Sequence, residues 1–117
     1  MELGLKGKKA LVTGGSHGIG LATVQVLREE GCIVTSLSRR EGFDLLDDGI
    51  DKAIELGLLN VDILVNNVGG GGRWKLDDWQ DVMKVNLLPM VYLTRYVIKQ
   101  MCLQHWGRVI TISSIHG

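Results

Sequence analysis

A glycine-rich loop over residues 13–20 (Thr-Gly-Gly-Ser-His-Gly-Ile-Gly) constrains the fold of this 117-residue chain more than any other feature. An apolar run over residues 9–13, typical of a buried parallel strand, leads into the loop. Residues 19–30 follow, with apolar side chains at the spacing of an amphipathic helix. Gly31 stands where a helix commonly ends, and residues 32–37 form a second β-branched run. The order strand, loop, helix, strand predicts a βαβ unit.

The rest of the chain continues the alternation of strand and helix patterns. The sequence predicts a small strand over residues 43–45, a helix over 48–58, a strand over 61–66, helix over most of 76–106 and a last strand over 108–113. A break near Asn86 is expected because Pro89 suits the first turn of a new helix, which Gly107 then ends. About five strands alternating with helices indicate a single α/β domain over 1–117 with a doubly wound, Rossmann-like parallel sheet.

Composition and charge narrow the class of protein. Apolar residues make up 45% of the chain, as in a globular domain. The 13 basic residues balance 13 acidic ones, which argues against nucleic acid or an anionic membrane as a partner. Cys32 and Cys102 are too few for a disulfide framework or a metal site. The first residues lack a signal-peptide pattern, and no apolar run is long enough to span a membrane. We expect a soluble, cytoplasmic protein.

The glycine loop is suited to binding phosphate. Glycine lets the backbone adopt positive φ and leaves no Cβ in the way of a pyrophosphate group. The free N–H groups and the positive dipole end of the following helix then attract the anion. An ordinary glycine-rich turn is the alternative interpretation, but the position between a strand and a helix favours a dinucleotide site.

The spacing of Gly14, Gly18 and Gly20 in the pattern Thr-Gly-x-x-x-Gly-x-Gly resembles that of the short-chain dehydrogenase/reductase family. Further motifs occur in the order of that family: Asn-Asn-Val-Gly over 66–69, Asn86 in the long helix, and Gly-Arg-Val at 107–109 leading to Ser-Ser-Ile-His-Gly at 113–117. The resemblance extends over the chain from Lys6 onward. It implies a Rossmann fold, a nicotinamide dinucleotide, and hydride transfer to or from the carbonyl or alcohol carbon of a small-molecule substrate.

The resemblance assigns cofactor contacts to the glycine loop, to the end of the second strand with the polar segment after it, and to the loop after the strand over 61–66. The residues that it places against the dinucleotide are Gly14, Ser16, His17, Gly18, Ile19, Gly20, Ser38, Arg39, Asp44, Leu45, Asn67, Val68 and Gly69. Residues 44–45 correspond to the pair that meets adenine, whereas residues 67–69 line the nicotinamide side.

The end of the second strand indicates which dinucleotide is bound. By resemblance, Ser38 occupies the position where NAD-preferring members carry Asp, and Arg39 follows it. A guanidinium at this place favours a 2′-phosphate through charge-assisted hydrogen bonds, so NADP is favoured over NAD. His17 stands where many NADP-preferring relatives carry Arg. The alternative is that Arg39 and Arg40 are a solvated pair in a turn.

The resemblance implies two catalytic positions: Ser114, which polarises the carbonyl oxygen, and Asn86, which holds a water of the proton relay. The alternative role for Ser114 is to end a strand and cap the next turn. The Tyr-x-x-x-Lys segment that supplies the family's acid and its lysine is absent, and Tyr96 and Lys99 have the wrong spacing. We therefore expect a truncated domain that is inactive alone.

Three explanations of the missing segment stay open. The chain is an N-terminal fragment of a reductase, a natural short protein that binds NADP without turning it over, or one half whose partner chain supplies the rest. An uncovered parallel edge and apolar face invite association. The long helix carries more apolar side chains than one sheet contact requires, namely Val82, Val85, Met90, Leu93, Val97, Ile98, Met101 and Cys102. We expect a homo-oligomer.

Overall fold

Strands and helices alternate along the chain in a computed structural model that describes residues 3–45, 47–67 and 87–112. The elements are, in order, β1 (Lys9–Thr13), α1 (Gly18–Glu29), β2 (Ile33–Leu37), the 3-10 turn η1 (Arg39–Glu41), α2 (Gly49–Glu55), β3 (Ile63–Asn66), α4 (Leu88–Leu103) and β4 (Arg108–Thr111). The predicted βαβ unit is therefore confirmed as β1, α1 and β2, with bounds that agree to within one residue.

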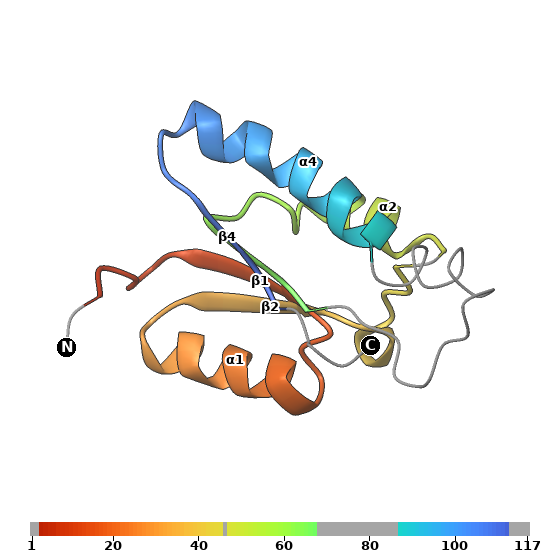
Figure 1. Cartoon of the computed structure of the whole chain (residues 1–117), viewed down its shortest axis with the longest axis horizontal. Coiled ribbons are helices and arrows are strands. Elements are labelled where there is room, and N and C mark those ends of the chain that lie inside the picture. The colour runs from red at the N-terminus through yellow and green to blue at the C-terminus, as the bar shows by residue number, and fades with distance from the viewer. Residues whose placement is uncertain (1–2, 46, 68–86, 113–117) are drawn as a thin grey trace.

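The four strands form one parallel sheet in the order β2-β1-β3-β4. Helix α1 covers one face of the sheet, and α2 and α4 lie on the other face (Figure 1). Parallel strands need such crossovers, because each connection must return to the same end of the sheet. The arrangement confirms the predicted doubly wound α/β fold.

Two apolar cores lie on the two faces of the sheet. Alternate residues of a strand point to opposite faces, so Leu11 of β1 joins the core beneath α2 and α4, whereas Ala10 and Val12 join the core beneath α1. Leu93 of α4 and Val24 of α1 are buried on the respective sides. The carboxyl ends of β1, β2 and β3 are thereby fixed from both faces.

The helix ends follow the turn signals in the sequence. Gly31 has φ +88°, and its N–H donates to the Arg28 carbonyl oxygen, so the predicted glycine stop of α1 is confirmed. Pro89 lies in the first turn of α4, as predicted. The same helix was expected to continue to Trp106 but ends at Leu103. His105, which has φ +58°, takes the chain out of the helix before Gly107.

The small strand predicted over residues 43–45 was wrong. The carbonyl oxygen of Asp44 accepts hydrogen bonds from the amides of Asp47 and Gly49, so this segment is a turn into α2. The side chain of Phe43 packs on the core beneath α2, which explains its apolar character without a strand. The described part of the sheet consequently has four strands and not five.

Candidate cofactor site

The glycine loop lies at the carboxyl end of β1, where ligands bind in open parallel sheets. Gly14 and Gly18 have φ +63° and +57°, a left-handed backbone that favours glycine. A Cβ on Gly18 would meet open space, so this glycine serves the course of the backbone and not packing. Within the described residues α1 starts without a side-chain cap, which leaves the N–H groups of its first turn available to an anion.

Three other glycine positions allow close internal packing. A Cβ on Gly14 would lie 2.5 Å from the Asn67 backbone carbonyl oxygen, and one on Gly20 would collide with the Gly14 carbonyl oxygen and with Nδ2 of the Asn67 side chain. A Cβ on Gly15 would lie 2.5 Å from Ser36 Oγ. The loop therefore presses directly against the ends of β2 and β3, and glycine is needed there for packing as well as for any phosphate.

Hydrogen bonds fasten the loop to the residues after β3. The Asn67 backbone N–H donates to Thr13 Oγ1 over 2.7 Å, and Asn67 Nδ2 donates to the Gly14 carbonyl oxygen over 3.3 Å. On the other side, Asn66 Nδ2 donates to Thr94 Oγ1 over 3.1 Å and so ties β3 to α4. Sequence reasoning had included Asn67 but missed Thr13 and Thr94. The position of Thr13 at the start of the glycine motif was the available signal.

The end of β2 presents a buried hydroxyl without a partner. Ser38 is only 8% exposed, and its Oγ forms no hydrogen bond within the structure. The Gly14 N–H donates to the Leu37 carbonyl oxygen over 2.8 Å, so Ser38 lies beside the glycine loop. Buried hydroxyls usually have a partner, and a hydroxyl group of a bound ribose fits this one. The residues at this position therefore suit a dinucleotide.

The basic pair after Ser38 is open to solvent. Arg39 and Arg40 form η1 together with Glu41, and both arginines are exposed. The Arg39 backbone carbonyl oxygen accepts from the Gly42 N–H, but its side chain forms no hydrogen bond or ion pair with the described part of the chain, so the guanidinium is available to an anion at the end of β2. A free guanidinium can bind a phosphate in a bidentate manner, through two parallel N–H···O hydrogen bonds.

The remaining predicted cofactor residues are partly accounted for. His17 is exposed at the start of α1, with Nδ1 lying 3.2 Å from Ser16 Oγ, and Ile19 is 64% exposed in the first turn. Asp44 and Leu45 are half-buried in the turn before α2. The structure thus brings the glycine loop, Ser38 and Asn67 together. Val68, Gly69, Asn86 and Ser114 lie outside the described residues.

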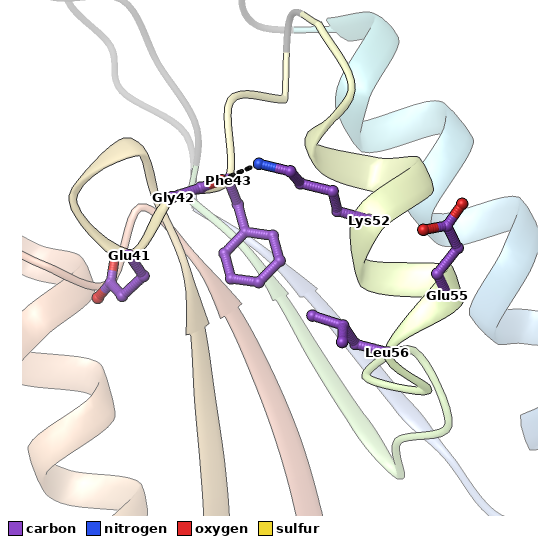
Figure 2. A pocket seen from close by; sticks show the side chains of 6 residues that line it. All are labelled: Glu41, Gly42, Phe43, Lys52, Glu55 and Leu56. Atoms are coloured by element: carbon purple, nitrogen blue, oxygen red, sulfur yellow. Dashed lines mark hydrogen bonds between the residues drawn. The ribbon is translucent and has the colours of Figure 1, made fainter.

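A pocket of about 380 Å³ lies next to the cofactor site and contains none of its predicted residues. Its lining consists of Glu41, Gly42, Phe43, Lys52, Glu55 and Leu56. Figure 2 shows Lys52 reaching across to Gly42, whose carbonyl oxygen accepts its hydrogen bond over 3.2 Å. Phe43 and Leu56 provide the apolar side chains of the pocket, and the lining comes from the connection between β2 and α2 and from α2 itself. The pocket is therefore distinct from the set of predicted dinucleotide residues.

The described residues contain neither a cluster of metal ligands nor a helix that could span a membrane. Among residues 3–45, 47–67 and 87–112, no three His, Cys, Asp or Glu side chains are grouped as they would be around a metal ion. Across the same ranges, every helix is too short or too polar to cross a membrane.

Comparison with known proteins shows the family. The family model for short chain dehydrogenase matches residues 46–117, which is more than half of the chain. A 3-oxoacyl-[acyl-carrier-protein] reductase, FabG, of Aquifex aeolicus is 33% identical over 147 residues and is matched over 100% of this chain and 59% of its own length. Nodulation protein G of Rhizobium meliloti is 37% identical, with coverage of 97% and 57%. This chain belongs to the short-chain dehydrogenase family.

Solved structures agree with that assignment. A crystal structure assigned as an NAD(P)-dependent gluconate 5-dehydrogenase from Beutenbergia cavernae, with NADP bound at low occupancy, superposes with a TM-score of 0.81 at 31% identity. It is matched over 95% of this chain and 55% of its own. A structure assigned as a β-ketoacyl-ACP reductase has a TM-score of 0.81 at 27% identity. The chain therefore spans a little over half the length of these relatives.

Proposed function

We propose that this chain is the cofactor-binding part of a soluble, cytoplasmic short-chain oxidoreductase and that it binds NADP in preference to NAD. The observation that carries the proposal is the arrangement at the end of β2, where the unpartnered hydroxyl of Ser38 lies beside the glycine loop and Arg39 stands free next to it. A ribose and a 2′-phosphate together would satisfy both groups.

In this proposal each predicted residue has a separate role. The first-turn amides at Gly18 and after it, with Ser16 and His17 beside them, hold the phosphates. The Ser38 hydroxyl forms a hydrogen bond with the adenosine ribose, as donor or acceptor, and Arg39 pairs with the 2′-phosphate. The turn at residues 44–45 lines the adenine, and residues 67–69 line the nicotinamide. When bound, the nicotinamide supplies or accepts the hydride.

The substrate is a carbonyl or alcohol compound in this proposal. Two of the similar proteins are a 3-oxoacyl-[acyl-carrier-protein] reductase and a gluconate 5-dehydrogenase, so the reduced or oxidised carbon differs among relatives of comparable similarity. Ser114 is proposed to polarise the substrate oxygen and Asn86 to hold a water that passes the proton. In this proposal both residues act together with an acid that these 117 residues do not contain.

A second candidate function is a dinucleotide-binding module without catalysis. The observation that favours it is the absence of Tyr-x-x-x-Lys from all 117 residues, which leaves the proton of the substrate hydroxyl without an acid in this chain. Under the first candidate, the remaining polypeptide or a second chain supplies that acid. Binding without turnover distinguishes the module.

We also propose a homo-oligomer, in which α4 contributes an outward face. Leu93, Val97 and Met101 are buried against the sheet, whereas Tyr92 and Leu103 are 58% and 78% exposed. Ile98 and Cys102, which the sequence had marked as excess apolar surface, are also exposed. An apolar helix face open to water is a common site of association.

The experiment for the proposed function is a titration of the chain with NADPH and with NADH, followed by fluorescence. Arg39→Ala should weaken NADPH binding about tenfold or more while NADH binding changes little, because only NADPH carries the 2′-phosphate. Arg40→Ala is the matched control, as it removes a neighbouring exposed guanidinium of the same turn.

Each outcome of that titration decides something. An unchanged preference in Arg39→Ala would discard NADP as the favoured cofactor. Failure of the chain to bind either dinucleotide would reject both candidate functions. If the chain binds NADPH, a panel of ketones and aldehydes tests turnover: oxidation of NADPH supports the oxidoreductase, and binding without oxidation supports the module.

A further inference from the structure

Strand β2 has an open edge. In the described part of the chain it pairs with β1 alone. The Ile33 N–H donates to the Lys8 carbonyl oxygen, and the Leu37 carbonyl oxygen accepts from the Gly14 N–H, so the alternate residues from Ile33 onward face β1. Because neighbouring residues of a strand direct their backbone groups to opposite sides, those of Val34 and Ser36 point to the open edge.

The short connection after β2 leaves this edge uncovered. Between β2 and β3 the chain has only η1 and the seven-residue helix α2. Neither element is a strand, so within the described residues this connection adds no strand to the outer side of β2.

The two ends of the edge carry complementary surfaces. At the amino end, Ile33 is 61% exposed, although it is a large apolar side chain. At the carboxyl end lies the pocket whose base is formed by Phe43 and Leu56, which is 66% exposed (Figure 2). Ile33 and Leu37 are four residues apart and point to the same face of the sheet, and Leu37 shares its core with Phe43. A protruding apolar side chain and an apolar hollow therefore lie on one face at opposite ends of the same strand.

We propose that a second copy of this chain pairs with β2 in antiparallel orientation, with the two-fold axis at Thr35. In this register Val34 of each copy lies opposite Ser36 of the other, and both pairs exchange their outward N–H and C=O groups. The edge is complementary to itself, as a two-fold interface requires. The result is one continuous sheet that contains eight of the described strands, four from each copy.

The same register seats the side chains. Ile33 of one copy lies opposite Leu37 of the other, on the face where the pocket opens, so that it fills the hollow between Phe43 and Leu56. Opposite charges also meet. Arg28 lies at the amino end of the edge, where its guanidinium lies 3.5 Å from the Val34 carbonyl oxygen. Glu41 lies at the pocket end, and the one ammonium there, of Lys52, is used on the Gly42 carbonyl oxygen.

Arg28 must break its contact with the open edge before a second copy can pair with β2. Its contact with the Val34 carbonyl oxygen covers the edge in the single chain, which is a common protection against edge-to-edge association. In the pair, this carbonyl oxygen accepts instead from Ser36 of the other copy, and the guanidinium is free to move to Glu41 of that copy. Arg28→Ala removes both the protecting contact and the pairing with Glu41, so it should leave the fold intact and change the dimer affinity less than the loss of Ile33 does.

The first test is sedimentation equilibrium of the chain at micromolar concentrations. We expect a dimer that Ile33→Asp weakens at least about tenfold, because a carboxylate would enter an apolar pocket. Val26→Asp is the matched control, since Val26 is an exposed apolar residue on α1 and belongs neither to the β2 edge nor to the α4 face, and it should leave this dimer unchanged. A monomeric wild type, or a dimer that responds to Val26→Asp and not to Ile33→Asp, overturns the proposal.

The second test fixes the register by cross-linking. Opposed residues of a non-hydrogen-bonded antiparallel pair have Cα atoms about 4.5 Å apart, within the range of a disulfide. In a Cys102→Ser background, Thr35→Cys should give a covalent dimer on mild oxidation, whereas Val34→Cys should not, because it faces Ser36. Cross-linking of both variants to the same extent, or of Val34→Cys alone, rejects the register, and circular dichroism checks that both variants fold.

Discussion

Strands β3 and β4 lie side by side in the same sheet but differ in burial at every position. All four residues of β3 are buried, whereas all four of β4 are exposed. Val65 and Ile110 are partners in the register, yet Val65 is 1% exposed and Ile110 is 51% exposed. The strand with neighbours on both sides and helices on both faces forms a core, and the edge strand does not.

This difference separates a well-packed cofactor side of the sheet from an exposed side at β4. The glycine loop, Ser38 and Asn67 rest on β1, β2 and β3, whose inward residues are packed by α1, α2 and α4. The cofactor side of the sheet is therefore held by residues of this chain. Val109 and Ile110 of β4 are exposed to solvent on opposite faces of the sheet. Their side chains therefore contribute little to the folding stability of the chain.

The largest expected effect comes from making the same substitution on the two strands. Val65→Ala should lower the free energy of unfolding by about 2–3 kcal/mol, because it removes buried methyl groups and leaves a cavity. Val109→Ala should cost less than about 1 kcal/mol, because that side chain is already 40% exposed. Urea denaturation measures both. Equal losses would mean that the β4 side is covered in solution, as in an assembly.

A smaller effect tests whether the cofactor side depends on close packing. Gly20→Ala should cost about 1–3 kcal/mol and weaken NADPH binding, because the added Cβ would collide with the Gly14 carbonyl oxygen and force the loop away from Asn67. Gly57→Ala is the control: Gly57 has φ +71° but open space around it, so it pays only the backbone cost. Thermal unfolding and NADPH titration of the two variants give the comparison. Loss of NADPH binding in Gly57→Ala would contradict this explanation.

The smallest effect concerns the thiol at the start of β2. Burial raises the pKa of Cys32 above its ordinary value of 9.0, and the charges of Glu30 and Asp62 raise it further. The folded chain thus holds this proton more tightly than the unfolded chain, so the stability it contributes is complete below pH 9.0 and is lost as the pH rises through the folded pKa. Denaturation at increasing pH should show a steeper fall in wild type than in Cys32→Ser. If Cys32→Ser and wild type lose stability in parallel above pH 9.0, the burial of Cys32 does not govern its titration.

Local patterns predicted most of the elements. The glycine motif placed the first βαβ unit, Gly31 marked the end of α1, and Pro89 marked the start of α4. Each of these signals acts within one turn of the backbone, so it can be read from neighbouring residues. The predicted strand over 43–45 failed because the apolar Phe43 packs from a turn, and a pattern of apolar residues cannot tell a turn from a short strand.

Contacts between residues that are far apart in the chain could not be predicted from the sequence. Thr13 and Asn67 are far apart in the chain, yet their hydrogen bond holds the loop against β3. That the glycines at 14 and 20 are required by Asn67, and that Ser38 keeps a buried oxygen without a partner, also followed only from the packed sheet. Gly14, Gly20, Ser38 and Asn67 had been predicted as cofactor residues, but the contacts that require these residue types had not been predicted.

By itself the sequence determined the alternation of strands and helices, the parallel sheet and the family, because periodicity, glycine and proline act locally and the motifs keep their order along the chain. The tertiary structure decided the order of the strands, which two of them are edges of the described sheet, and therefore which side chains are buried. A strand is buried only where strands and helices from distant parts of the sequence pack against it. In the described residues nothing pairs with the outer side of β2, and the side chains of β4 stay exposed.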